Sequence, residues 1–326
     1  MQSAITIANQ AIIMFILLFV GFFLYKKKMM SEETTKQLSK ITLSLVNPIV
    51  IFNSYQMDFD PQLLTGLFIA AGLAVAAHLI LIAFSRIAVR KGRPNEEIER
   101  FAVIYSNCGF LGIPLVQATF GSEGVFYLTG YITVFNLFMW THGVIIMRGS
   151  SSEGKQSPAK NLLKVLFSPA IIAIMLGLVF FFTGLRLPSI LQTPLDYLGS
   201  MNTPLAMLVS GATIAKAGLL KAFKCPRVYI VQLFKLAIVP VILSLLFAPL
   251  HFLGVNMLIP NVVLIAASAP TASATVMFAY THGRDAEYAS NHFALSTLAS
   301  MATMPLTLMF FAVLSAFVYV LSGGGV

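Results

Sequence analysis

Long apolar stretches, each ended by charged or turn-forming residues, dominate the chain. They cover residues 5–25, 36–56, 62–89, 98–120, 124–147, 161–184, 189–215, 227–251, 257–281 and 286–320. A helix needs about 20 apolar residues to cross a membrane, and each stretch reaches that length. The pattern therefore predicts an all-α polytopic membrane protein with ten transmembrane helices.

Residues with helix-capping chemistry stand where three of these helices are expected to begin. Ser31, Asn95 and Ser122 each precede one or two glutamates. A side-chain oxygen at such a position accepts hydrogen bonds from free backbone N–H groups, and negative charge is favourable at a helix N-terminus. We expect a helix to start beside each of the three residues.

Composition and the placement of charge agree with a membrane protein. Hydrophobic residues make up 58% of the chain and charged residues 10%, against about 25% charged in ordinary soluble domains. Of the 21 Lys and Arg residues, 20 lie in or beside the odd-numbered loops, and Arg186 is the exception. The positive-inside rule then places those loops in the cytoplasm and both termini outside. We interpret the net charge of +9 as topology in the cell inner (plasma) membrane, and expect no nucleic-acid partner.

Several other classes of protein are disfavoured by the sequence. Residues 1–25 contain no charge, which is the reverse of a secretory leader and predicts a retained first span. Cys108 and Cys225 lie far apart and belong to no metal-ligand spacing. The chain contains no HExxH, GxSxG or CxxC motif. We therefore expect no metal, no cofactor and no enzymatic activity.

The chain reads as two halves with a matching proline pattern. We predict a first five-helix repeat over 1–147, a cytoplasmic linker over 148–160 and a second five-helix repeat over 161–326. Pro48 and Pro204 are 156 residues apart, as are Pro114 and Pro270. An odd number of spans in each half gives the halves opposite orientations, so the pattern indicates an inverted repeat.

The prolines predict two interrupted helices, the fourth and the ninth. Pro114 has no N–H group and follows Gly109 and Gly112, which permit bending. Two such breaks meeting near the membrane midplane would aim free N–H groups and positive helix ends at one point, where an anion is the natural occupant. The alternative is chance, since membrane helices tolerate proline and 15 prolines produce some equal spacings.

Three blocks of sequence resemble the auxin efflux carrier family of PIN-like transporters. They are GFFLYKKKMMSEETTKQLSKITLSLVNPIVIFNS (21–54), YSNCGFLGIPLVQATFG (105–121) and APTASATVMFAYTHGRDAEYASNHFALSTLASMATMPL (269–306). The resemblance extends over essentially the whole chain. It implies two inverted five-helix repeats, with helices 1, 2, 6 and 7 as a scaffold and the others as a mobile transport domain. It also implies that helices 4 and 9 cross at their prolines beside the substrate.

The resemblance assigns roles to three residues and departs from the plant pattern at two. Asn107 matches the asparagine that contacts the substrate carboxylate, and Pro114 and Pro270 match the crossover prolines. Where plant carriers have glutamine and a second proline, this chain has Thr271 and Thr275, which argues against auxin itself. The long phosphorylated loop of the plant carriers is also missing. Bacterial relatives are associated with malate, malonate and similar carboxylates.

The expected substrate-binding residues follow from the crossover, and each has an alternative interpretation. They are Asn107, Cys108, Gly109, Pro114, Pro270, Thr271, Ser273 and Thr275. The asparagine could instead bridge helices, the hydroxyl residues could merely allow tight packing, and an unpaired cysteine is most often a small packing residue.

Five ionisable residues within apolar stretches are expected to have structural roles. Asp196 lies near an end of its span and is interpreted as interfacial rather than as an intramembrane acid. His78, His142 and His292 could relay protons, but are interpreted as packed or interfacial. Lys235 is expected to snorkel to the cytoplasm, so no cation is expected at the crossover.

These features together predict a secondary transporter of small organic anions that works by an elevator-type alternating-access mechanism. The expected partners are the anion, the lipid bilayer and a second copy of the chain in a homodimer. One alternative is a sodium-coupled symporter of the bile-acid-transporter type, in which hydroxyls of the last two helices would ligate sodium: Ser268, Ser296, Thr297 and Thr303. The other alternative is a membrane ligand sensor or a channel.

Overall fold

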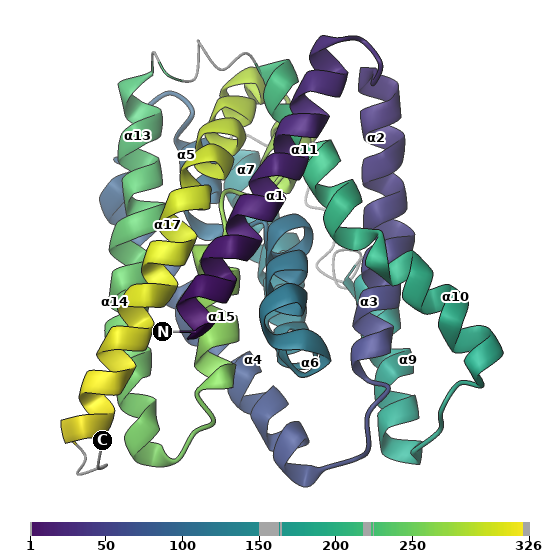
Figure 1. Cartoon of the computed structure of the whole chain (residues 1–326). Helices are drawn as coiled ribbons and strands as arrows, with labels where there is room; N and C mark the ends of the chain where they lie inside the picture. Colours follow the sequence, from purple (N-terminus) through teal and green to yellow (C-terminus); the bar gives the residue numbers. More distant parts are fainter. Residues whose placement is uncertain (1, 150–162, 164, 218–222, 224, 322–326) are drawn as a thin grey trace.

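The computed structural model describes residues 2–149, 163, 165–217, 223 and 225–321, and within them the chain is nearly all helical (Figure 1). No strand is found in these residues, only one isolated β-bridge. The predicted linker 148–160 lies outside the described residues except for its first two positions. The prediction of an all-α protein is confirmed for the described part.

Within residues 2–149 the first half is divided into ten helical elements rather than five uninterrupted helices. Its elements are α1 (Gln2–Lys26), α2 (Glu32–Ile41), η1 (Thr42–Val46), α3 (Asn47–Ser54), α4 (Pro61–Ala88), α5 (Glu96–Ile104), η2 (Cys108–Gly112), α6 (Ile113–Phe138), η3 (Met139–Gly143) and α7 (Val144–Arg148). Gly121 interrupts α6 with a φ of 63°, a left-handed value that glycine adopts without strain.

The second half has the same character. Its elements are α9 (Pro169–Thr183), α10 (Ser189–Ser200), α11 (Asn202–Ala217), α13 (Pro226–Leu233), η5 (Phe234–Ile238), α14 (Val239–Phe247), η6 (Ala248–Leu253), α15 (Leu258–Ser268), α16 (Ala274–Thr281) and α17 (Ala286–Leu321). Four continuous helical segments of the described chain are long and apolar enough to cross a membrane: Pro61–Ala88, Cys108–Arg148, Pro226–Leu253 and Ala286–Val320.

The three predicted helix starts have different outcomes. Ser31 caps α2, because its hydroxyl accepts a hydrogen bond from the Thr34 backbone N–H at 3.0 Å. Asn95 precedes α5 with a left-handed φ of 62° and makes no side-chain cap. Near Ser122, the non-helical residue is Gly121. The helix starts beside Ser31 and Asn95 are therefore confirmed, and α6 resumes after Gly121 beside Ser122, but of the three residues Ser31 alone is seen to make a side-chain cap.

Prolines inside the long helices are accommodated by π-helical turns. The turns η1, η2 and η5 end two residues before Pro48, Pro114 and Pro240. Proline lacks an N–H group and its ring crowds the carbonyl four residues earlier. In each turn the backbone instead bonds five residues back, as Ile113 N–H does to the Cys108 carbonyl. The wider turn lets the helix continue through the proline.

The helices form two groups that pack within themselves. The α1 group contains α1, α2–α3, α9 and α10–α11, and the α17 group contains α4, α5–α7, α13–α14, α15–α16 and α17. In Figure 1, α2, α3, α9 and α10 lie on one side, whereas α13, α14 and α17 lie on the other. The groups meet where α17 contacts α1 and α11, and where α6 contacts α3.

Two glycines allow α1 and α11 to approach closely. A methyl group at Gly211 would overlap the backbone of Leu18 and Phe22, and one at Gly21 would overlap the backbone of Leu208. Small residues at such crossings are typical of membrane helix packing, because they let two backbones touch. The α1–α11 contact is therefore specified by these glycines.

Gly211→Ala is expected to destabilise the protein by about 1–3 kcal/mol, the usual cost of overpacking. Thermal unfolding in detergent measures the effect. The matched control is Gly72→Ala on α4, where an added methyl group meets no atom within 4 Å and alanine favours the helix. Equal melting temperatures for the two variants would contradict the proposed packing role.

Candidate functional site

Two helix breaks meet in the interior of the α17 group. The first break (residues 105–107) separates α5 from η2, and the second break (residues 269–273) separates α15 from α16. An antiparallel β-bridge pairs Ser106 with Thr271. Its hydrogen bonds run from Asn107 N–H to the Pro270 carbonyl at 2.7 Å and from Ala272 N–H to the Tyr105 carbonyl at 2.9 Å.

The bridge brings helix ends of both signs together. The carbonyl ends of α5 and α15 and the amide ends of η2 and α16 all border the breaks. The first N–H groups of a helix have no intrahelical acceptor, and the two ends of a helix carry opposite partial charges. We call the place where residues 105–107 and 269–273 meet the crossing. Its chemistry suits an anion at the amide ends and a cation at the carbonyl ends.

The first break does not lie where the proline pattern predicts it. Pro270 lies within the second break, but Pro114 lies inside the continuous helix that follows the first break, because the π-helical turn η2 accommodates it. The helices that precede the breaks end at Ile104 and Ser268, which are 164 residues apart. The 156-residue spacing of the prolines therefore does not superimpose the two breaks.

Lys235 lies at the crossing, contrary to the expectation that it would snorkel to water. Its side chain is fully buried, and its Nζ donates to Ser106 Oγ at 3.1 Å and to the Ala267 carbonyl at 3.2 Å. The acceptors are a residue of the first break and the last turn of α15, where carbonyl groups lack helical partners. The expectation that no cation stands at the crossover is therefore wrong.

Hydrogen bonds from neighbouring helices hold the second break. The Thr271 hydroxyl donates to the Ala102 carbonyl at 3.2 Å, and the Thr271 N–H donates to Ser296 Oγ at 3.1 Å. Gln232 reaches both Thr271 Oγ1 at 3.3 Å and His292 Nδ1 at 3.0 Å. Thr271 thus has a structural role as a residue that joins α5, α13 and α17.

The other predicted hydroxyl residues of this break differ from Thr271. Ser273 is half-buried, whereas Thr275 is fully buried and its hydroxyl has no partner. Buried polar groups are almost always hydrogen-bonded. The unpaired hydroxyl of Thr275 is therefore available to a ligand, and that of Thr271 is already engaged.

Asn107 combines burial with an unpaired amide. The residue is 4% exposed, and its side-chain Nδ2 has no hydrogen-bond partner. It stands at the N-cap position of η2 without making a side-chain cap. Cys108 is buried beside it, and the Gly109 carbonyl accepts a hydrogen bond from Asn47 Nδ2 at 3.2 Å. Asn107 is the residue of the first break that most resembles a binding group.

Two more buried asparagines lie near the first break, on the α1 group. Contacts between the antiparallel helices join Asn53 with Asp196 and Glu32 with Lys216. That register places Asn47 level with Asn202, and α11 also contacts η2.

Both asparagines keep unsatisfied polar atoms. Asn47 Oδ1 is unpaired, and neither amide atom of Asn202 has a partner. The α1 group therefore presents amide groups at the level of the first break. Asn47 stands directly before Pro48, and Asn202 stands two residues before Pro204. This match between the two halves was the signal in the sequence.

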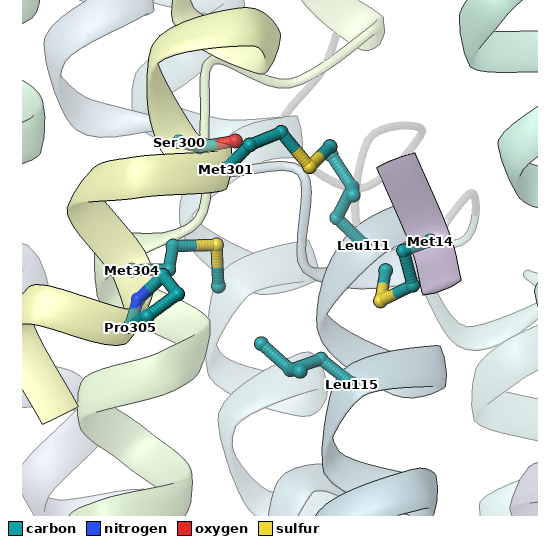
Figure 2. Close-up of a pocket in the computed structure, with 7 residues that line it drawn as sticks. All are labelled: Met14, Leu111, Leu115, Ser300, Met301, Met304 and Pro305. Atoms are coloured by element: carbon teal, nitrogen blue, oxygen red, sulfur yellow. The ribbon is translucent and has the colours of Figure 1, made fainter. Parts of the chain in front are cut away.

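A small apolar cavity lies beside η2, between the two helix groups. Figure 2 shows Met14 of α1, Leu111 and Leu115, and Met301 and Met304 of α17 around it. Its volume is about 10 Å³, the minimum that holds one water molecule. Methionine side chains adapt readily to new shapes, so the shape of this lining can adjust.

The remaining ionisable residues within the apolar stretches are bonded locally. Asp196 is exposed and accepts hydrogen bonds from Asn53 at 3.0 Å and Gln192 at 2.7 Å. His78 is buried against Tyr131 and Phe138. These contacts agree with the packed and interfacial roles expected for Asp196 and His78.

His142 is half-buried and lies 3.0 Å from the Tyr105 hydroxyl, measured from its Nδ1. His292 is fully buried and bonded to Gln232. Among the described residues, no group of three His, Cys, Asp or Glu side chains could hold a metal ion.

Sequence reasoning missed Lys235, Ser106 and Gln232 as members of the crossing. Lys235 is the only lysine within the apolar stretch 227–251, and that isolation was the one available signal. Ser106 stands directly before Asn107 but lacks any distinguishing pattern. Gln232 lies in the same helix as Lys235, one turn earlier, and polar residues at that spacing share a helix face.

Comparison with known proteins agrees with the family resemblance. The profile of a family described as "Membrane transport protein" matches residues 6–308. An "Uncharacterized transporter" from Methanothermobacter thermautotrophicus is 26% identical over 298 residues, covering 89% of this chain and 94% of that protein. A "Putative malonate transporter" from Rhizobium meliloti is 24% identical over 295 residues, covering 88% and 90%. The chain is therefore a membrane transport protein that belongs to the auxin efflux carrier family.

Proposed function

We propose that the protein is a secondary carrier of small organic anions, of the size of malonate and malate, and that the anion binds beside the paired breaks. The observation that carries this proposal is the buried, unpaired amide of Asn107 at the start of η2. A carboxylate there would accept hydrogen bonds from the side chain and from free N–H groups of the helix end. The buried amides of Asn47 and Asn202 would complete the site from the α1 group.

The substrate class is supported by two further features. The name of the Rhizobium meliloti relative includes malonate, and the alignment covers 88% of this chain and 90% of that protein. The crossing offers amides, a hydroxyl and helix ends rather than an arginine clamp, which suits a small carboxylate and gives modest affinity.

An elevator-type displacement of the α17 group against the α1 group fits the distribution of polar contacts. The Arg227–Glu99 and Arg284–Glu97 ion pairs join helices of the α17 group. The Lys216–Glu32 ion pair joins α11 with α2 in the α1 group, and the Arg186–Asp58 ion pair joins the loop after α9 with the loop after α3. Between the groups run single hydrogen bonds, such as Tyr55 to Thr129 at 2.6 Å. Each group is thus held internally more firmly than it is held to the other.

The proposed topology has ten spans in two inverted five-span repeats, with broken crossover helices 4 and 9. Gly121 then separates the fourth span from the fifth. The charge pattern supports cytoplasmic odd-numbered loops, extracytoplasmic termini and residence in the inner membrane. A homodimer is the assembly proposed for this carrier.

Asn107→Ala is expected to weaken malonate binding about tenfold, equivalent to about 1.4 kcal/mol. The purified protein is screened by thermal shift against malonate, malate and indole-3-acetate, with and without sodium, because a ligand of the native state raises apparent stability. The matched control is Asn261→Ala, whose amide bonds the Met257 carbonyl within its own helix at 2.8 Å. This variant should bind malonate as the wild type does.

Two results would contradict the proposal. One is the absence of a shift with any carboxylate, and the other is unchanged binding by Asn107→Ala. Flux in proteoliposomes distinguishes a carrier from a sensor, since a sensor binds the anion without counterflow.

A further inference from the structure

The side-chain amine of Lys235 contacts the first break at Ser106 and the end of α15 at Ala267. These contacts do not fill its hydrogen-bonding capacity. The structure pairs Nζ with two acceptors, Ser106 Oγ and the Ala267 carbonyl, so a neutral amine keeps its lone pair free to bind a proton, and an ammonium keeps a third N–H donor. Ser106 directly precedes Asn107, so the amine and the proposed anion site are neighbours across one residue of the first break. Lys235 is fully buried.

The elements packed around η5 bring no carboxylate to this amine within the described residues. Cys108 and His78 are titratable groups close to Lys235, and the Tyr131 hydroxyl lies 3.2 Å from Ser106 Oγ, which accepts from Lys235. From α17, His292 bonds Gln232.

Arg227 of α13 and Glu99 of α5 are already paired with each other. Arg227 lies two turns before Lys235 and forms a bidentate ion pair with Glu99 at 2.9 and 3.1 Å. Lys235 therefore has no charged counter-ion of its own in the part of the chain that the structure describes.

A buried ammonium without a counter-ion carries a large desolvation cost, which a nearby anion offsets. Binding of a proton to Lys235 and binding of an anion beside Asn107 must therefore favour each other. By linkage, the anion draws a proton onto the amine, and loss of that proton weakens binding of the anion.

We propose that Lys235 couples substrate to protons: the neutral amine takes up one proton from the buffered solution as the carboxylate binds, and it returns that proton to the solution when the carboxylate leaves. On the carrier, the only bond made or broken is this N–H bond. The bound carboxylate and the protonated lysine move together, and the proton neutralises one negative charge of the anion. The ammonium is bound to the carbonyl end of α15, where a carrier of another kind would need a coupling cation such as sodium. Binding of the anion is therefore independent of sodium. This inference rests on the proposed anion site.

Calorimetric titration with malonate, in buffers of different ionisation enthalpy, counts the protons taken up per bound malonate. At a pH where malonate is fully ionised, the wild type should take up as much as one proton, with or without sodium. Its affinity should fall about tenfold per pH unit once Lys235 is mostly neutral in the empty carrier. Lys235→Arg should bind malonate without proton uptake and without this pH dependence, because arginine stays charged.

Lys235→Gln keeps a hydrogen-bond donor but cannot take up a proton, and it should bind malonate more weakly with no uptake. The matched control is His78→Gln, which removes the neighbouring titratable ring and should leave proton uptake intact. Malonate binding by the wild type without proton uptake, or uptake that persists in Lys235→Gln, would overturn the role of Lys235 while leaving the anion site standing. If the wild type binds no carboxylate at all, the proposed function fails as well.

Discussion

Glu99→Gln is expected to lower the free energy of unfolding by about 2–4 kcal/mol, because it leaves a largely buried guanidinium without its counter-ion. Glu99 is 2% exposed and accepts from Arg227 at 2.9 and 3.1 Å and from the Tyr288 hydroxyl at 2.8 Å. Arg227 also donates to the Ala88 carbonyl at 2.9 Å. One carboxylate thus joins α5, α13 and α17, and the arginine adds the end of α4.

Thermal unfolding in detergent measures the loss, with Glu33→Gln as the matched control. Glu33 is exposed and accepts one long hydrogen bond from Gln37 at 3.3 Å, so its replacement should change stability by less than about 0.5 kcal/mol. The double variant Glu99→Gln with Arg227→Gln should recover part of the loss, because the unpaired charge is removed. If Glu99→Gln and Glu33→Gln have the same melting temperature, the Arg227–Glu99 ion pair does not stabilise the α17 group.

The helices and the second break follow from local sequence. Apolar stretches of spanning length define where the helices run, and Pro270 among small and hydroxyl residues marks a segment that cannot stay helical. The N-cap at Ser31 is likewise local, since it depends on a hydroxyl and the three residues after it. Features that depend on short-range chemistry could therefore be predicted.

The first break and the buried lysine depend on packing that no local pattern contains. Residues 105–107 include neither proline nor glycine, and their non-helical conformation is held by hydrogen bonds to the second break, more than 160 residues later. The sequence predicts the break at Pro114, because no sequence pattern reveals the π-helical turn Cys108–Gly112 that accommodates this proline within the helix. Lys235 lies two turns from the start of its helix, where the direction of the side chain decides between water and the crossing.

Cross-linking positions 47 and 109 is expected to reduce malonate flux at least about tenfold if the two helix groups slide past each other during transport. Asn47 belongs to the α1 group and Gly109 to the α17 group, and Asn47 Nδ2 donates to the Gly109 carbonyl at 3.2 Å. A Cβ atom at Gly109 would lie 3.5 Å from that nitrogen, which is an ordinary contact. Asn47→Cys with Gly109→Cys, in a background of Cys108→Ser and Cys225→Ser, accepts a short bifunctional thiol reagent.

Flux of labelled malonate into proteoliposomes is compared before cross-linking, after it and after reductive cleavage of the linker, so each sample is its own reference for the substitutions. The matched control is Asn53→Cys with Asp196→Cys, a pair whose side chains bond at 3.0 Å inside the α1 group. Linking that pair should leave flux unchanged, because both residues move together. If the reduced 47/109 pair is itself inactive, Leu43→Cys with Gly109→Cys spans the same interface, since Leu43 lies 3.9 Å from the same Cβ position. Flux that survives either cross-link between the two groups would exclude the elevator displacement. Loss of flux in the cross-linked 53/196 control would show that transport needs flexibility within the α1 group, and the loss in the 47/109 pair would then not be evidence of sliding between the groups.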